Sequence, residues 1–270
     1  MSAQTAAPPL EHTLDISSTR PVPFGRLVRT ELRKSHDTRA GMWLLLTIVL
    51  LTLVVEGIAL AVTTVQDEPM NFGDFVGAAA FVTSVLLPVL GIMLVTSEWG
   101  QRTAMVTFAL EPRRPRVILA KLVTGLVLTL VTAAFAVTVG LVCNLLYAAI
   151  QGQSPSWEFG LNFLVGFLIT QSLAMLGGFA LAALFLNTAV AIVVFFVYKW
   201  VLPGIFTAGA ALIGWFSDLA PWIDFQTAQE AIWDWSSEAE DWAQLAVSGF
   251  IWLVIPLAIG IRRVLRAEVK

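Results

Sequence analysis

Six apolar runs are the feature that most constrains how this chain can fold, because each is long enough to cross about 30 Å of hydrocarbon as a helix. They cover residues 42–65, 75–97, 117–150, 159–186, 189–216 and 245–261. Only 13% of the residues are charged, whereas an ordinary soluble domain has about 25%. The sequence therefore predicts an all-α integral membrane protein with six transmembrane helices.

The two ends of the sequence suggest one transmembrane domain preceded by a tail. Residues 1–22 are polar and contain no apolar stretch of the kind that a secretory signal peptide requires. We therefore expect a disordered tail that is not cleaved, followed by a single six-helix domain over residues 23–270. Cys143 is the one cysteine, which excludes an intrachain disulfide and a thiolate metal cluster.

Basic residues fall on one side of this six-helix topology. Fifteen of the sixteen lysines and arginines precede the first run, lie between the second and third or at the start of the third, or follow the sixth. The loops of the other side carry acidic residues instead, namely Asp67, Glu68, Asp74, Glu158, Asp218, Asp224, Glu230, Asp234, Glu238, Glu240 and Asp241. Because positively charged loops stay in the cytoplasm, we expect both termini there and the chain in a bacterial cytoplasmic membrane.

Two further segments are amphipathic and are expected to lie at the membrane surface. From residue 23 onward, apolar residues recur at helical spacing among basic ones, which is typical of a helix on an anionic inner leaflet; they are Phe24, Leu27, Val28 and Leu32. On the opposite side a second stripe predicts one outer amphipathic helix, formed by Phe225, Ala228, Ile232, Trp235, Ala239 and Trp242. The apolar stretch over residues 215–222 is expected to re-enter the membrane and to be broken at Pro221.

The groups that an enzyme of the membrane would need are missing from the sequence. It contains no G-x-x-x-x-G-K-[ST] phosphate loop and no H-E-x-x-H zinc helix. Its histidines, His12 and His36, lie in the lead-in before the first span, so an intramembrane serine protease would have no base. No aspartate lies within a span. We therefore expect a chain that is not an enzyme and that binds no metal or cofactor itself.

Two charged residues lie near the middle of predicted spans, at similar depth. Glu56 is about 21 Å from the start of the first span and Lys199 about 18 Å from the hairpin at Asn187, at ~1.5 Å per residue. A lone charge at mid-membrane is costly, so we expect the two side chains to pair or to line a shared aqueous cavity; a pair that only fixes helix register is the alternative. Gln171, in the fourth span, is expected to form an interhelical hydrogen bond rather than to contact a substrate.

Proline and small residues inside the spans predict where helices bend and approach one another. Pro88, Pro203 and Pro256 should each kink a span. Ala174, Gly178 and Ala182 recur every fourth residue. Such a small-residue face is typical of close packing between helices of one chain, with a dimer contact as the alternative.

The stretch over residues 97–122, SEWGQRTAMVTFALEPRRPRVILAKL, connects the second and third spans on the basic side. Its Glu98, Thr103, Pro112 and Lys121 resemble the first cytoplasmic loop of ABC type 2 transporter permeases, in which a glutamate, a Gly-Thr pair, a Leu-x-x-Pro-x-x-Arg run and a lysine follow in this order. The family arginine corresponds to one of three residues here, which are Arg113, Arg114 and Arg116. Arg102 stands where the family usually has glycine. The likeness extends over about residues 25–270.

This resemblance implies the transmembrane subunit of an ABC exporter. In such permeases the loop carries a coupling helix that docks on a separate ATP-binding subunit, which binds ATP and Mg²⁺. It implies two copies of this chain with two ATPase subunits. It also implies charged or structural contacts with the ATPase, or with lipid headgroups, for Glu98, Arg102, Thr103, Pro112, Arg113, Arg114 and Arg116; the alternative is that the arginines only determine topology.

The expected function is therefore outward movement of a hydrophobic or amphipathic compound. An ion-gradient-driven secondary transporter that uses Glu56 as its protonatable group is the alternative. A scaffold or sensor that transports nothing is a third possibility.

Overall fold

The computed structural model describes residues 22–66, 69–157, 160–233, 235 and 237–267. The predicted tail lies outside these residues except for Val22, as do the acidic loop residues Asp67, Glu68, Glu158 and Asp234. Every regular element of the described residues is helical. Six helices are long and apolar enough to cross a membrane, which confirms the predicted number of spans and suggests a multi-pass membrane protein.

The first four spans are single helices, and the last two each contain a short π-helical turn. The spans are α2 (Arg39–Gln66), α3 (Phe72–Gly100), α5 (Arg114–Gln151), α6 (Leu161–Phe185), then α7 (Thr188–Phe196) with η1 (Val197–Val201) and α8 (Leu202–Leu212), and finally α12 (Ala239–Gly249) with η2 (Phe250–Val254) and α13 (Ile255–Arg266). The fifth span ends four residues before its predicted end, because Ile213 is extended. The sixth begins six residues before its predicted start.

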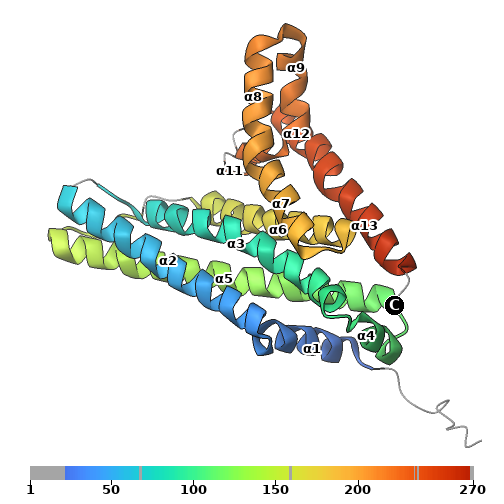
Figure 1. Ribbon diagram of the computed structural model, residues 1–270. Coiled ribbons are helices and arrows are strands. Elements are labelled where there is room, and N and C mark those ends of the chain that lie inside the picture. The colour runs from blue at the N-terminus through green and yellow to red at the C-terminus, as the bar shows by residue number, and fades with distance from the viewer. Residues whose placement is uncertain (1–21, 67–68, 158–159, 234, 236, 268–270) are drawn as a thin grey trace, which may run out of the picture.

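Two of the six spans form the centre of the molecule, and two are peripheral. About half of the most apolar stretch of α3 and of α6 is buried, against 11% for the fifth and sixth spans. Figure 1 shows α2, α3, α5 and α6 running together as a bundle, while α8, α9 (Gly214–Ile223) and α12 project away from it. Two short helices, α1 (Phe24–Asp37) and α4 (Ala104–Leu110), lie at the end of the bundle where α5 begins and α13 finishes. We call this the α1 end.

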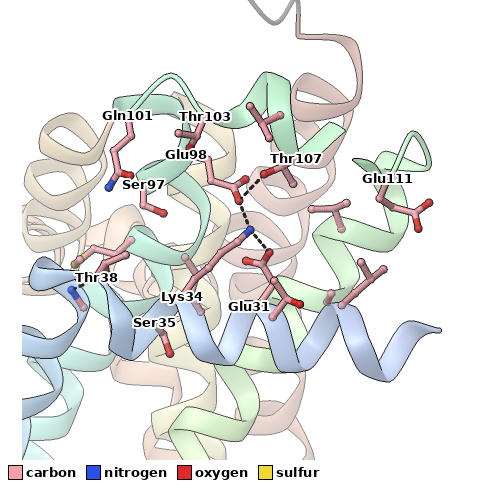
Figure 2. Close-up of a pocket in the computed structure, with 18 of the residues that line it drawn as sticks. Glu31, Lys34, Ser35, Thr38, Ser97, Glu98, Gln101, Thr103, Thr107 and Glu111 are labelled. Carbon is pink, nitrogen blue, oxygen red and sulfur yellow. Dashed lines mark hydrogen bonds and ion pairs between the residues drawn. The ribbon is translucent and has the colours of Figure 1, made fainter. Parts of the chain in front are cut away.

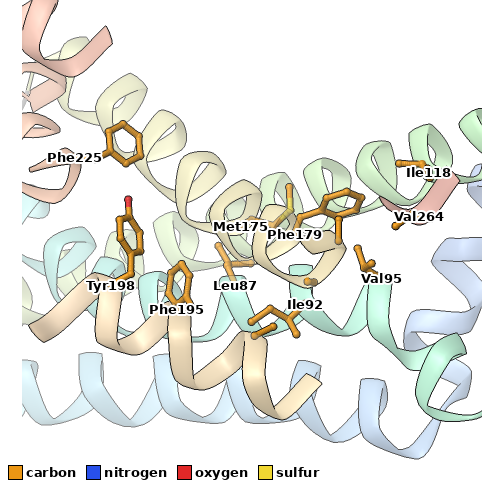
Figure 3. Packing of buried hydrophobic residues seen from close by; sticks show 13 residues of the cluster. Leu87, Ile92, Val95, Ile118, Met175, Phe179, Phe195, Tyr198, Phe225 and Val264 are labelled. Carbon is orange, nitrogen blue, oxygen red and sulfur yellow. The ribbon is translucent and has the colours of Figure 1, made fainter. Parts of the chain in front are cut away.

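The contact between α3 and α6 depends on small residues. A side chain at Gly178 would collide with the carbonyl oxygen of Pro88, and one at Gly91 would collide with the carbonyl oxygen of Met175. The predicted small-residue face therefore packs within this chain. Around it lies a buried apolar cluster (Figure 3) that includes Leu87, Phe179 and Phe195.

The prolines of the spans act differently from one another. The helix α3 runs without interruption through Pro88. In each of the last two spans, a π-helical turn comes directly before a helix whose second residue is proline. The turn contains the residue four positions before that proline, which is Pro203 in the fifth span and Pro256 in the sixth. A wider turn at that place accommodates the proline ring, which clashes with the i−4 carbonyl of a regular helix. The two π-helical turns meet, since the rings of Tyr198 and Trp252 lie 5.0 Å apart.

The outer segment between the last two spans is not the single amphipathic helix that the spacing predicts. It consists of α9 (Gly214–Ile223), which folds back beside α8 (Figure 1), and two one-turn helices, α10 (Phe225–Ala228) and α11 (Glu230–Trp233). Asp224 accepts hydrogen bonds from two backbone N–H groups of α10 and so starts a new helix.

Two features of this segment correct the prediction. Ala239 and Trp242 belong to α12, which begins where Asp241 accepts a hydrogen bond from the Glu238 backbone. Pro221 lies inside α9 and does not break it. These local caps divide an apolar periodicity that would otherwise suit one helix.

Candidate functional site

Four helices meet at the α1 end around a network of charged side chains, which we call the ion-pair cluster (Figure 2). The ammonium of Lys34 lies 2.7 Å from carboxylate oxygens of both Glu31 and Glu98. The ammonium of Lys121 lies 2.7 Å from the second oxygen of Glu31 and 3.3 Å from the second oxygen of Glu98. Thr107 donates a hydrogen bond of 3.0 Å to Glu98. The cluster therefore joins α1, α3, α4 and α5.

Helix geometry explains why these residues meet. Glu31 lies three residues after Val28 and four after Leu27, so it occupies the apolar face of α1, which packs along α5. Lys121 is two turns into α5 and faces this side of α1. Glu98 stands in the last turn of α3, where the chain turns towards α4.

Most of the cluster is removed from solvent. The side chains of Glu31, Glu98 and Lys121 are each no more than 8% exposed, whereas that of Lys34 is 40% exposed. Burial alone would lower the pKa of Lys34, but the hydrogen bonds and attraction of Glu31 and Glu98 outweigh it and raise that pKa. The lysine therefore remains charged. Losing one partner of such a buried set leaves an uncompensated charge, which typically costs about 3–5 kcal/mol.

The turn between α3 and α4 requires an unusual backbone conformation. The N–H of Thr103 bonds to the carbonyl of Glu98, and the N–H of Arg102 bonds to that of Trp99. This is the Schellman arrangement that ends many helices, and its penultimate residue adopts the left-handed conformation that glycine favours. Arg102 occupies that position with φ of 57°.

The predicted coupling residues divide into two groups. Arg102, Thr103, Pro112 and Arg113 are exposed at the α1 end. Arg114 instead donates to backbone carbonyls at the end of α13, at 2.9–3.3 Å, and its guanidinium lies 4.8 Å from the centre of the Phe108 ring.

Arg116 is also used within the chain. It donates to Glu111 at 2.9 Å and to the carbonyl of Val22 at 2.7 Å. Arg114 and Arg116 therefore tie the loop to this chain, whereas the four exposed residues of the predicted coupling set present their side chains to the surroundings.

A cavity of about 620 Å³ lies beside the cluster, between α1, α2, α3, α4 and α5. Figure 2 shows Lys34 and Glu98 at its wall, with Ser97 and Thr103 nearby. Leucines of α2 and α3 line its deeper part, together with polar and apolar residues of the other three helices.

Glu56 and Lys199 do not pair, which corrects the hypothesis drawn from their equal depth. Glu56 is fully buried, and apart from the Cys143 thiol its carboxylate has no hydrogen-bond partner among the described residues. It faces α5, where Cys143 is its neighbour. Lys199 lies against the Trp200 ring, 5.6 Å from its centre, and lines a small cavity with Tyr198 and other residues of the last two spans. Equal depth does not fix which way a side chain faces around the helix.

Gln171 makes the interhelical hydrogen bond that the sequence suggests. Its side-chain amide donates to the carbonyl of Ala80 at 3.3 Å and so joins α6 to α3.

Sequence reasoning missed Glu31 and Lys34, the two residues that α1 contributes to the cluster. The available signal was Glu31 itself, a single acid on the apolar face of a basic helix. Such a residue requires a basic partner from another element.

Comparison with known proteins does not identify this chain, since no protein-family profile and no curated protein sequence matches it.

Proposed function

We propose that this chain is the transmembrane permease subunit of an ABC exporter, which moves a hydrophobic or amphipathic compound outward while a separate subunit hydrolyses ATP. The observation that carries the proposal is the ion-pair cluster, since it ties the short helix α4 to both neighbouring spans. A force on the exposed loop around α4 would reach α3 through Glu98 and α5 through Lys121.

The arrangement of charge supports an orientation with this end in the cytoplasm. Helix α1, the α3–α5 connection and the end of α13 lie together at the α1 end (Figure 1). All three are rich in basic residues, as the positive-inside rule requires of a cytoplasmic face. Helix α1 would then lie at the inner membrane surface, with both termini in the cytoplasm of a bacterial cell.

The backbone at Arg102 supports the likeness to type 2 permeases. In that family a glycine usually precedes the threonine, and here the corresponding residue has the left-handed conformation that favours glycine. Arg102 therefore has the backbone shape that a glycine at this position would favour.

The peripheral spans support an assembly of two permease copies. Large apolar side chains of the last two spans are exposed, among them Val193, Ile205 and Ile259. In a membrane these faces contact lipid or a second copy, and a path between two copies would open as the bundles rock.

Co-purification with an ATP-binding cassette subunit tests the proposal. We expect an ATPase encoded beside this chain to remain bound to it in detergent, and the double substitution Arg102→Glu/Arg113→Glu to weaken that binding at least tenfold. Arg29→Glu is the matched control, because Arg29 is exposed on α1 and takes no part in the loop. Undiminished binding by the double variant would contradict the assignment of this loop.

One observation favours ion-gradient-driven transport as a second candidate. A buried carboxyl group inside a span is typical of a proton or cation path, and Glu56 is such a group, with the thiol of Cys143 beside it. Under this alternative, the purified chain in liposomes would move substrate on a proton or sodium gradient without any ATPase, and Glu56→Gln would abolish that movement.

A further inference from the structure

The cavity beside the ion-pair cluster has the size of a ligand site. Its volume of about 620 Å³ falls within the 300–1,000 Å³ that is usual for small-molecule pockets. Residues of five helices line it, and α1 forms one wall (Figure 2).

The lining changes from polar to apolar along α3. Ser97, Glu98 and Gln101 line the cavity at the α1 end, and Leu90, Met93 and Leu94 line it deeper in the span. Leu90 is eight residues before Glu98, which places it about 12 Å deeper at ~1.5 Å per residue. Leu44 and Leu45 of α2 face this deeper part and pack against Leu90 and Leu94. The cavity is therefore amphipathic, and an amphiphile suits it.

The acidic groups of the wall are already matched in charge by cations of this chain. Both oxygens of Glu31 and both oxygens of Glu98 already accept from lysines. Both oxygens of Glu111 accept as well, from the Arg113 backbone and from Arg116.

Two basic side chains of the wall keep hydrogen-bond donors that are not used within the described part of the chain. An ammonium has three N–H bonds, and Lys34 uses two of them on Glu31 and Glu98. Among the described residues, the guanidinium of Arg26 has no side-chain partner, although it lines the cavity. Arg26 and Lys34 are eight residues apart and therefore share a face of α1. Spare cationic donors at the polar end match an anionic headgroup.

From this we propose that the cavity binds an acidic phospholipid of the membrane leaflet beside α1, with its phosphate between Arg26 and Lys34 and an acyl chain along the leucines of α2 and α3. The proposal goes beyond transport, because it requires only that the chain lies in a membrane. A lipid in this place would hold α1 against α3 and α4.

Native mass spectrometry of the full-length chain tests the proposal. The detergent-purified protein is titrated with phosphatidylglycerol or with phosphatidylcholine of the same acyl chains. We expect phosphatidylglycerol to bind at least tenfold more tightly, and Arg26→Gln to remove most of that preference. Arg29→Gln is the matched control, since Arg29 lies on the same helix, is exposed and does not line the cavity. Equal binding of both lipids, or equal effects of the two substitutions, would overturn the headgroup assignment.

Two further binding measurements identify which part of the lipid the cavity recognises. Leu45→Trp narrows the apolar part of the cavity and leaves Arg26 unchanged. It should therefore reduce the binding of phosphatidylglycerol through its acyl chain alone. If that variant fails to fold, the comparison of Arg26→Gln with Arg29→Gln still tests whether the cavity recognises the acidic headgroup. Inorganic phosphate should not displace the lipid at matched concentration. Displacement by phosphate would show a plain anion site and would overturn the proposal.

Discussion

The ammonium of Lys121 lies 2.7 Å from a carboxylate oxygen of Glu31, although 90 residues separate them in the sequence. Both side chains are at most 7% exposed. This ion pair fixes α1 to α5, and together with Lys34 and Glu98 it joins the lead-in helix to the connection between two spans.

Removing one member of this pair should destabilise the fold strongly. We expect Lys121→Met to lower the free energy of unfolding by about 3–5 kcal/mol, because Glu31 and Glu98 lose a buried cation. The double variant Lys121→Met/Glu31→Leu should recover much of the loss, since Lys34 and Glu98 can still pair. Thermal unfolding in detergent measures the stability of the single and of the double variant. A double variant less stable than Lys121→Met would contradict this account, and Asp37→Asn, in the exposed pair with Arg33, is the control that should change little.

The contribution of Lys34 should depend on pH in one direction. Its pKa is raised above the ordinary 10.5 in the folded protein, so the folded state binds the proton more tightly than the unfolded state. This stabilisation is fully present below the unfolded pKa and is lost as pH rises through the folded pKa. The difference in unfolding temperature between wild type and Lys34→Gln should be constant around neutral pH and should shrink under strongly alkaline conditions. A difference that grows with pH would contradict the assigned ion pairs.

Glycine should suit position 102 better than the native arginine as far as stability is concerned. Arg102 has a φ of 57°, which costs an L-residue roughly 1–2 kcal/mol and costs glycine little. We expect Arg102→Gly to raise the free energy of unfolding by about 1 kcal/mol. Arg102→Ala removes the same guanidinium but keeps the Cβ atom, so it should give no such gain. Equal stability of the two variants would show that the turn is not strained.

Close packing between α3 and α6 should make position 178 intolerant of a methyl group. A Cβ atom there meets the Pro88 backbone, whereas one at Gly177 meets only the Phe195 ring, at 3.4 Å. We expect Gly178→Ala to cost about 1–3 kcal/mol through overpacking, and the neighbouring Gly177→Ala to cost clearly less. Unfolding temperatures of the two variants give the comparison, and similar values would argue against the α3–α6 contact.

The spans were predictable from sequence because lipid imposes one simple requirement, a long apolar helix. The same reasoning found the loop that contains Glu98 and Lys121. It did not find their partners, because the sequence does not show that Glu31 packs against α5. The pairing of Glu56 with Lys199 was wrong for a related reason, since equal depth leaves the direction around each helix undetermined.

The outer segment shows a different limit of sequence reasoning. Its apolar spacing suits one helix, but Asp224 and Asp241 start new helices by accepting backbone hydrogen bonds. Short-range polar contacts of this kind outweigh a periodic pattern over a few turns.

ATP hydrolysis by a complex of this chain with the proposed cassette subunit is the most direct test of the central claim, that the ion-pair cluster couples the α4 loop to the spans. The measurement compares substrate-stimulated ATPase activity of wild type and Glu98→Gln in lipid nanodiscs, after showing that both bind the ATPase equally. We expect Glu98→Gln to lose most of the stimulation while basal hydrolysis continues. The neutral side chain forms no ion pair with Lys34 or Lys121, so the α4 loop is held less firmly to α1 and α5. Full stimulation in that variant would contradict the account.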